Sequence, residues 1–224
     1  MIKSIIEFYK EQMKQNIKIA ILGGNGRTGK FLVNQLLSQG YSLKLLLRNP
    51  QKFLINSPLI EIIEGDAIDE GKVDLLIQGC QAVMSTMSQR GGEPLLASCA
   101  TQNILKAMEK YGLKRYMVLA GINIDAPFDK KGVQTSMATE FMKANYAIPH
   151  ADKQKSYAIL TNSDLDWTFV RVPLIEFDTP AVPINIDLED CAGDKISAAS
   201  IAAFMIEQLT ESSFVCQAPF ISNV

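Results

Sequence analysis

The chain has 224 residues, 47% of them hydrophobic and 21% charged, which is the composition of one self-sufficient globular domain. A net charge of −2 gives no general attraction for a polyanion, so we expect no nucleic-acid partner. Four widely spaced cysteines without a CxxC pair, together with a single histidine, predict a reduced, cytoplasmic protein without a metal site. No apolar run approaches the roughly 20 residues of a membrane span, so we expect no membrane partner.

Residues 1–16 form the first predicted element. Glu7 and Glu11 interrupt this segment, so it lacks the continuous apolar stretch of a signal peptide. Its apolar residues fall near helical spacing, at Ile2, Ile5, Ile6, Tyr9 and Met13. We expect an N-terminal helical extension over 1–16 that packs on the domain or on a partner, and one domain over 17–224.

From residue 17 onward, short β-rich runs alternate with amphipathic segments. Strands are predicted at 17–22, 43–47, 60–64, 82–86, 115–120, 167–172 and 214–221. Helices are predicted at 30–38, 69–78, 94–111, 134–145, 151–161 and 197–209. This alternation predicts βαβ units with right-handed crossovers, hence a doubly wound parallel sheet in a three-layer α/β/α domain. Inserts near 121–150 and 173–195, the second marked by three prolines, are expected to form a small substrate lobe.

The segment GGNGRTG, residues 23–29, stands between the first predicted strand and the first predicted helix. Gly23 permits a sharp exit from the strand, Gly26 a close approach of backbone to a pyrophosphate, and Gly29 a helix lying near the strand. The helix N-terminus then offers unpaired N–H groups to the phosphates. A plain βα turn, the alternative, needs only one glycine. The candidate cofactor-binding residues in this turn are Gly23, Asn25, Gly26, Arg27, Thr28 and Gly29.

Arg48 follows the second predicted strand, where a chain that prefers NAD usually carries Asp or Glu for the ribose 2′-hydroxyl. Arg27 of the glycine turn can lean toward the same spot. Two guanidiniums suit the dianionic 2′-phosphate of NADP, which they can grip in bidentate fashion. The alternative is that both are solvated surface arginines. We expect NADP as the cofactor of a Rossmann domain, with NAD left open.

These residues, with others along nearly the whole chain, resemble the atypical short-chain dehydrogenases that have an NAD(P)H-binding Rossmann domain. The further marks are Gly65-Asp66 after the third strand, the stretch 85–88 ending the fourth, and the segments SDLDWT (163–168) and VRVP (170–173). The last two are similar to the family's SGLDWT…RP pattern, although Asp164 replaces a glycine and Val172 intervenes before Pro173. The nearest subgroup is the small flavin reductase/biliverdin reductase type.

The resemblance implies roles for several residues at predicted strand ends. Asp66 and Ala67 would flank the adenine, and Ser85, Thr86 and Met87 would line the nicotinamide ribose. Carboxyl ends of strands are where α/β sheets place their ligands, which agrees independently. Ordinary strand-end capping is the alternative for the two hydroxyl residues.

The acid–base set of ordinary short-chain dehydrogenases is missing. No tyrosine has a lysine four positions later, and the fifth predicted strand ends in Leu119-Ala120-Gly121 without the family's Ser or Thr. Two candidate catalytic residues remain. Lys153 matches a lysine that the family places beside the cofactor ribose, with a helix-surface lysine as the alternative. His150 could donate a proton near neutral pH, with surface or capping use as the alternative.

Hydride transfer to an electron-poor acceptor demands little acid from the protein, because the cofactor supplies the difficult chemistry. We therefore predict an NADPH-dependent reductase of a flat conjugated acceptor, such as a flavin or a quinone-like compound. Met87, Pro127, Phe128 and the loop 173–183 are expected to wall the acceptor pocket. The alternative is a non-catalytic NADP(H) sensor that regulates a protein partner. The missing Tyr-x-x-x-Lys pair disfavours a third class, a nucleotide-sugar isomerase or epimerase, and a homodimer is left open.

Overall fold

The computed structural model describes residues 17–89, 95–211 and 213–224. The helical extension predicted over 1–16 and the predicted helix start at Pro94 lie outside these residues. Within the described chain the strands are β1 (Lys18–Leu22), β2 (Ser42–Leu47), β3 (Ile60–Glu64), β4 (Ala82–Ser85), β5 (Arg115–Gly121), β6 (Asp166–Val172), β7 (Leu174–Glu176), β8 (Ile184–Asp187), β9 (Lys195–Ser197) and β10 (Phe220–Asn223).

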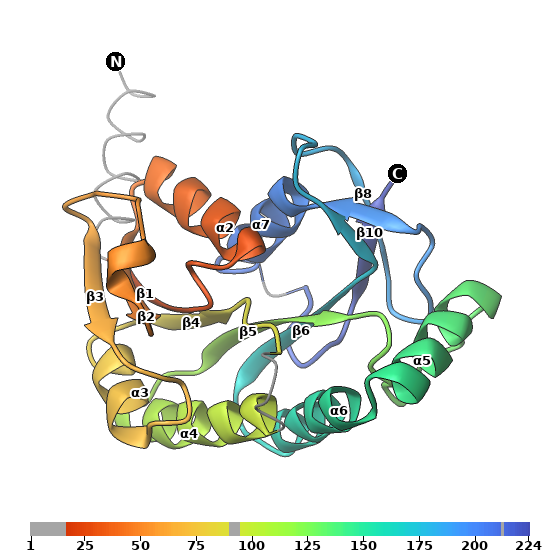
Figure 1. The fold of residues 1–224 in the computed structure, drawn as a ribbon, viewed down its shortest axis with the longest axis horizontal. Coiled ribbons are helices and arrows are strands. Elements are labelled where there is room, and N and C mark those ends of the chain that lie inside the picture. Colours follow the sequence, from red (N-terminus) through yellow and green to blue (C-terminus); the bar gives the residue numbers. More distant parts are fainter. Residues whose placement is uncertain (1–16, 90–94, 212) are drawn as a thin grey trace.

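The helices alternate with these strands, as the periodicity predicts. They are α2 (Arg27–Ser38), α3 (Glu70–Ile77), α4 (Leu96–Tyr111), α5 (Val133–Asn145), α6 (Ala147–Thr161) and α7 (Ala198–Glu207), with a short 3-10 helix at Pro50–Lys52. Figure 1 shows α2 and α7 packed on one face of the sheet and α3, α4 and α6 on the other. The predicted three-layer, doubly wound Rossmann domain is therefore confirmed.

The main sheet has the strand order β3-β2-β1-β4-β5-β6-β10-β8. All its neighbours pair in parallel except β8, which runs antiparallel to β10. Because β1 pairs with both β2 and β4, the strand order reverses at β1. Ligands of open α/β sheets bind at such a reversal, outside the carboxyl ends of the strands.

Two hydrophobic clusters, one on each face of the sheet, form the core. The central strands contribute to both, since successive side chains of a strand point to opposite faces. In β1, Ala20 and Leu22 pack toward α3 and α4, while Ile19 and Ile21 pack toward α2 and α7. Burial on both faces explains why the central strands are continuous apolar runs without polar alternation.

The structure corrects several predicted boundaries. Helix α2 begins at Arg27, three residues before the predicted start, because Gly26 is the N-cap and Thr28 and Gly29 are already buried helical residues. Helix α6 begins at Ala147, so His150 lies in its first turn and not before it. The last strand is confined to Phe220–Asn223, since residues 214–216 form a turn and Gln217 makes only an isolated bridge to Thr168.

The insert after β6 also contains strands that the sequence did not predict. Strands β7 and β9 are three residues each and pair only with one another, and β8 covers the edge of β10. Strands this short carry too few residues for a period of two to emerge in the sequence.

Candidate functional site

Two adjoining cavities open at the carboxyl ends of the parallel strands. The larger has a volume of about 490 Å³ and the smaller about 280 Å³. Both are lined by Gly26 of the glycine turn and by Thr86 and Met87 after β4. The pair of cavities therefore meets at the point of strand-order reversal, where the fold predicts a ligand.

The glycine turn has the backbone geometry that its sequence predicts. Gly23 has φ +81°, a left-handed conformation, and a Cβ there would lie 2.8 Å from the Met87 nitrogen. A Cβ on Gly29 would overlap the carbonyl oxygen of Gly23, so only glycine lets α2 start this close to β1. The Thr86 hydroxyl donates to the same carbonyl at 3.3 Å and ties the end of β4 to the turn.

The start of α2 has the character of an anion site. Its N-cap, Gly26, provides no side-chain hydrogen bond, and no acidic residue lies in the first turn. The first backbone N–H groups of the helix thus face the cavity with a partial positive charge. The side-chain oxygen of Asn25 is buried and finds no hydrogen-bond partner within the described chain. These features fit the diphosphate and sugar of a dinucleotide.

The smaller cavity brings together three predicted residues, Arg48, Asp66 and Ala67. Arg48 is exposed at its rim, and the carbonyl of buried Ala67 accepts a hydrogen bond of 3.0 Å from Asn103. Lys52, at the end of the 3-10 helix, lines the same cavity. Sequence reasoning missed Lys52, although a basic residue four positions after Arg48 was a visible signal.

The structure does not bring Arg27 to Arg48, so that part of the prediction is wrong. Arg27 lines the larger cavity, and its guanidinium carbon lies 3.6 Å from the ring centroid of Phe177. A guanidinium over an aromatic face is a favourable cation–π arrangement. Phe177 follows β7, whose position the sequence did not predict.

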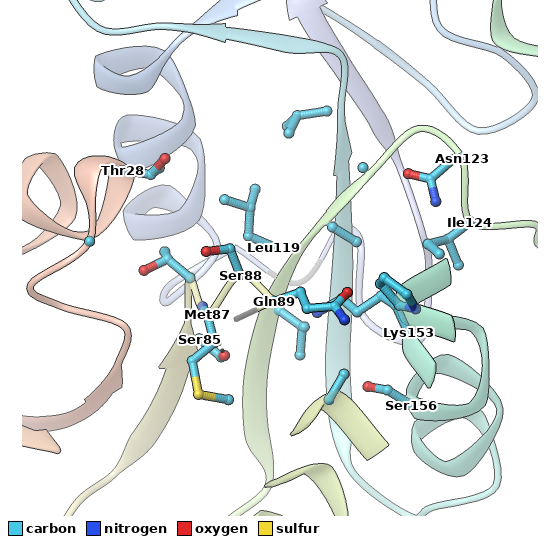
Figure 2. Close-up of a pocket in the computed structure, with 18 of the residues that line it drawn as sticks. Thr28, Ser85, Met87, Ser88, Gln89, Leu119, Asn123, Ile124, Lys153 and Ser156 are labelled. Atoms are coloured by element: carbon cyan, nitrogen blue, oxygen red, sulfur yellow. Dashed lines mark hydrogen bonds between the residues drawn. The ribbon is translucent and has the colours of Figure 1, made fainter. Parts of the chain in front are cut away.

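The larger cavity is walled by several segments that are distant in sequence. Figure 2 shows Ser85 and Met87 from the end of β4 on one side and Asn123, Lys153 and Ser156 on the other. Thr86 lines it as well, so all three residues predicted for the nicotinamide ribose lie together.

Lys153 lies on α6 with its ammonium 5.5 Å from the ring centroid of Phe169. Burial lowers the pKa of this lysine to about 8, since an apolar setting disfavours its charged form. The adjacent Asp152 does not pair with it. Its carboxylate accepts hydrogen bonds from the Ala97 and Ser98 backbone nitrogens at 2.7 and 3.2 Å and so caps α4.

His150, the second catalytic candidate, is buried and lines the same cavity. Its Nδ1 lies 2.9 Å from the Nδ2 of Asn123, a residue on the loop after β5. Burial is the main cause that lowers the pKa of His150 below its ordinary value. Sequence reasoning missed Asn123, since nothing local links a loop residue to a histidine on a later helix.

A set of buried hydroxyl groups beneath the cavity was also missed. The Thr101 and Ser156 hydroxyls lie 2.8 Å apart, and the fully buried Tyr116 lines the same cavity as Ser85 and Thr101. Burial raises the pKa of Tyr116 far above its ordinary value, so this phenol stays protonated. The only sequence signal was a tyrosine within the apolar run of β5.

Some of the residues that were expected to wall the acceptor pocket line the larger cavity, and others do not. Met87 and, from the loop 173–183, Pro173, Ile175 and Phe177 line the larger cavity, whereas Pro127 and Phe128 do not. Phe128 is 81% exposed. The reason is the buried ion pair of Arg171 with Asp129, at 2.7 Å, which holds this loop so that Asn123 and Ile124 face the cavity instead.

No group of three or more His, Cys, Asp or Glu side chains with metal-binding geometry occurs in the described chain. All four cysteines are free thiols. Among the described helices, none has the length and apolar character needed to cross a bilayer.

Residues 23–212 match the NAD(P)H-binding family, and the chain belongs to it. This membership, together with the Rossmann fold, confirms the resemblance to atypical short-chain dehydrogenases and the expectation of a nicotinamide dinucleotide cofactor. An uncharacterized chloroplastic protein of Arabidopsis thaliana is 25% identical over 211 residues, which are 88% of this chain and 74% of that protein. A bifunctional dihydroflavonol 4-reductase/flavanone 4-reductase of Pyrus communis is 34% identical over 74 residues, which are 29% of this chain and 21% of that protein.

Solved structures share the fold at low identity. A short-chain dehydrogenase/reductase of Veillonella parvula, solved in complex with NADP, has a TM-score of 0.77 at 14% identity and covers 92% of this chain and 94% of its own. ChuY, an anaerobillin reductase of Escherichia coli O157:H7, has a TM-score of 0.73 at 17% identity, with 92% of this chain and 97% of its own covered. At these identities the likeness shows the fold.

Proposed function

We propose that the protein is an NADPH-preferring oxidoreductase that reduces a flat, conjugated acceptor of the flavin or quinone class. The observation that carries this proposal is the pair of cavities meeting at the glycine turn. The smaller cavity has basic residues at its rim. The larger cavity continues well past the strand ends into a partly apolar space. A dinucleotide needs the first and part of the second, which leaves room for an acceptor.

Each segment of the site has a role in this proposal. The amides at the start of α2 bind the diphosphate, and Asn25 contributes its unpartnered oxygen. Arg48 and Lys52, which line the smaller cavity, would bind the 2′-phosphate, the role that the sequence assigned to Arg48 and Arg27. Ser85, Thr86 and Lys153, which line the larger cavity, would contact the nicotinamide ribose. When bound, the cofactor supplies a hydride.

The far part of the larger cavity supports a flat, conjugated acceptor. Apolar side chains from four segments make up much of the wall of the larger cavity as a whole and would exclude water around the reacting atoms. They are Met87, Leu119, Ile124, Met142, Val172, Ile175 and Phe177. The name of ChuY, an anaerobillin reductase with this fold, is in keeping with an extended conjugated acceptor. A cytoplasmic location and a small-molecule partner belong to the same proposal.

Steady-state oxidation of NADPH with FMN, dichlorophenolindophenol and quinones tests this function. We expect turnover with at least one acceptor and a lower KM for NADPH than for NADH. Gly29→Ala, which blocks the diphosphate turn, serves as the negative control for contaminating reductases. Tight NADPH binding by calorimetry without turnover of any acceptor would overturn the reductase proposal, because a dinucleotide-binding regulator would then explain the same site.

A further inference from the structure

The contact between Asn123 and His150 determines which ring nitrogen of the histidine carries the proton. The amide Nδ2 of asparagine can only donate a hydrogen bond. Because this Nδ2 lies 2.9 Å from Nδ1 of His150, it can donate only to an unprotonated Nδ1. A neutral imidazole then has its proton on Nε2. Within the described chain no hydrogen bond to Nε2 is found, and His150 lines the larger cavity.

Several contacts hold Asn123 in this position. The Gln154 side chain, one turn after His150 on α6, forms two hydrogen bonds of 2.9 Å with the backbone of Asp125. Arg171 donates to the carbonyl of Ile124 at 3.1 Å. A Cβ on Gly121 would overlap the side-chain oxygen of Asn123, so the glycine leaves room for the amide. These contacts therefore fix the position of the loop after β5 relative to α6.

The surroundings keep His150 neutral. Its burial is the largest influence and lowers its pKa, and Lys143 of α5 and Lys131 of the loop act in the same direction. Asp125 and Glu140 oppose them. Since the ordinary histidine pKa is about 6.5, a lowered value leaves the ring uncharged at neutral pH.

We propose that the larger cavity recognises an uncharged hydrogen-bond acceptor, a carbonyl oxygen or imine-type nitrogen on a conjugated ring, through the Nε2–H of His150, and that Asn123 is the positioning residue that fixes this tautomer. The choice of ligand rests on the proposed reductase function, whereas the tautomer does not. A ligand group that can only donate a hydrogen bond cannot use this Nε2–H.

The single histidine of the chain makes the tautomer directly measurable. A long-range ¹H–¹⁵N correlation spectrum of the ¹⁵N-labelled full chain contains one imidazole. We expect an unprotonated Nδ1 and a protonated Nε2 at neutral pH. In Asn123→Asp the carboxylate can only accept, so the proton moves to Nδ1 and the titration midpoint rises. Asn145→Asp adds the same charge on the exposed end of α5 and should leave the tautomer unchanged. A protonated Nδ1 in the neutral wild-type ring, or no change in Asn123→Asp, overturns the assignment.

Recognition of the ligand is tested with menadione and FMN as probes on the NADP⁺-saturated protein. We expect the Nε2–H resonance to shift on addition of at least one probe, and no shift with either would overturn the proposal. In turnover, His150→Leu should raise the acceptor KM by about 3- to 10-fold, the effect of one lost hydrogen bond. His150→Gln keeps an N–H donor, so its acceptor KM should lie between that of His150→Leu and that of the wild type.

The two proposals fail in distinguishable ways. If the wild-type protein reduces no acceptor while the Nε2–H shift is observed, the reductase function fails and the binding inference stands. If the wild type turns over and His150→Leu has the wild-type acceptor KM, the binding inference fails and the function stands. NADPH affinity by calorimetry should be equal in all these variants, which reports that the fold is intact.

Discussion

At the scale of single residues, the proposed preference for NADP over NAD depends on Arg48. It stands where an acidic residue would bind a ribose 2′-hydroxyl, and the smaller cavity places Lys52 beside it. Arg27 takes no part in this choice, because its guanidinium lies over Phe177 at the larger cavity.

Replacing Arg48 with Asp should weaken NADPH binding by about 1.5–3 kcal/mol, the usual value of a hydrogen bond to a charged group. NADH, which lacks the 2′-phosphate, should bind equally well or better. Titration calorimetry with both cofactors measures this difference. Arg27→Gln is the matched control and should leave the ratio of NADPH to NADH affinity unchanged. Equal loss of affinity for both cofactors in Arg48→Asp would contradict the role of Arg48.

Lys153 gives the stability of the protein a predictable pH dependence. In the unfolded chain this lysine holds its proton up to its ordinary pKa of about 10.4, whereas burial lowers its folded pKa to about 8. Between these values the unfolded state binds more protons at Lys153, so the contribution of this lysine to stability should rise with pH across the window, whereas Cys80, whose pKa burial raises to about 11, contributes in the opposite direction. Urea unfolding at a series of pH values measures the rise.

Lys153→Met should abolish most of that rise, because the titrating group is gone. Lys155→Met, on the exposed side of the same helix, should retain it. An identical pH dependence in Lys153→Met and the wild type would show that the pKa of Lys153 is not lowered in the folded protein.

At the scale of elements, the close approach of the Gly29 backbone to the Gly23 carbonyl determines where α2 begins after β1. The helix begins at Arg27 only because nothing larger than hydrogen projects from Gly29 toward the Gly23 carbonyl. An N-cap without a side-chain hydrogen bond is a weak helix start by itself. It leaves the backbone amides free for a ligand, and the anchoring of Thr86 to the turn compensates in part.

Gly29→Ala should therefore displace the start of α2 and abolish measurable NADPH binding, and it should lower the thermal midpoint. Gly71→Ala is the opposite control, since Gly71 lies in the first turn of α3 and a Cβ there meets nothing closer than 3.4 Å. That change should stabilise the protein by about 0.4–1 kcal/mol by restricting the unfolded chain. Circular dichroism melts and calorimetry measure both variants, and wild-type NADPH affinity in Gly29→Ala would refute the geometry of the turn.

At the scale of the whole molecule, the strand order concentrates the site at the carboxyl ends of the central strands. Reversal at β1 separates the smaller cavity, beside β2, from the larger one, beside β5 and β6. The loop after β5 reaches the larger cavity because Arg171 of β6 pairs with Asp129 in the interior. Breaking such a buried pair is costly, so the far end of the cavity depends on the packing of the sheet as much as on its own residues.

The sequence alone predicted the residues of the proposed cofactor side of this protein. Seven consecutive residues carry the glycine turn, and an arginine directly after a strand carries the 2′-phosphate prediction, so local geometry was enough to place them. The alternation of buried strands and amphipathic helices likewise determined the three layers, because its periods follow from the backbone itself.

Only the tertiary structure decided which side chains meet around the larger cavity, where the acceptor is proposed to bind. Asn123 meets His150 across 27 positions, Thr101 meets Ser156 across 55, and Arg27 lies over Phe177 from the unpredicted β7 segment. Side-chain pairs this far apart leave no periodic signal in the chain. They form because the helices and loops pack on the sheet in one arrangement. Contacts throughout the whole core fix that arrangement.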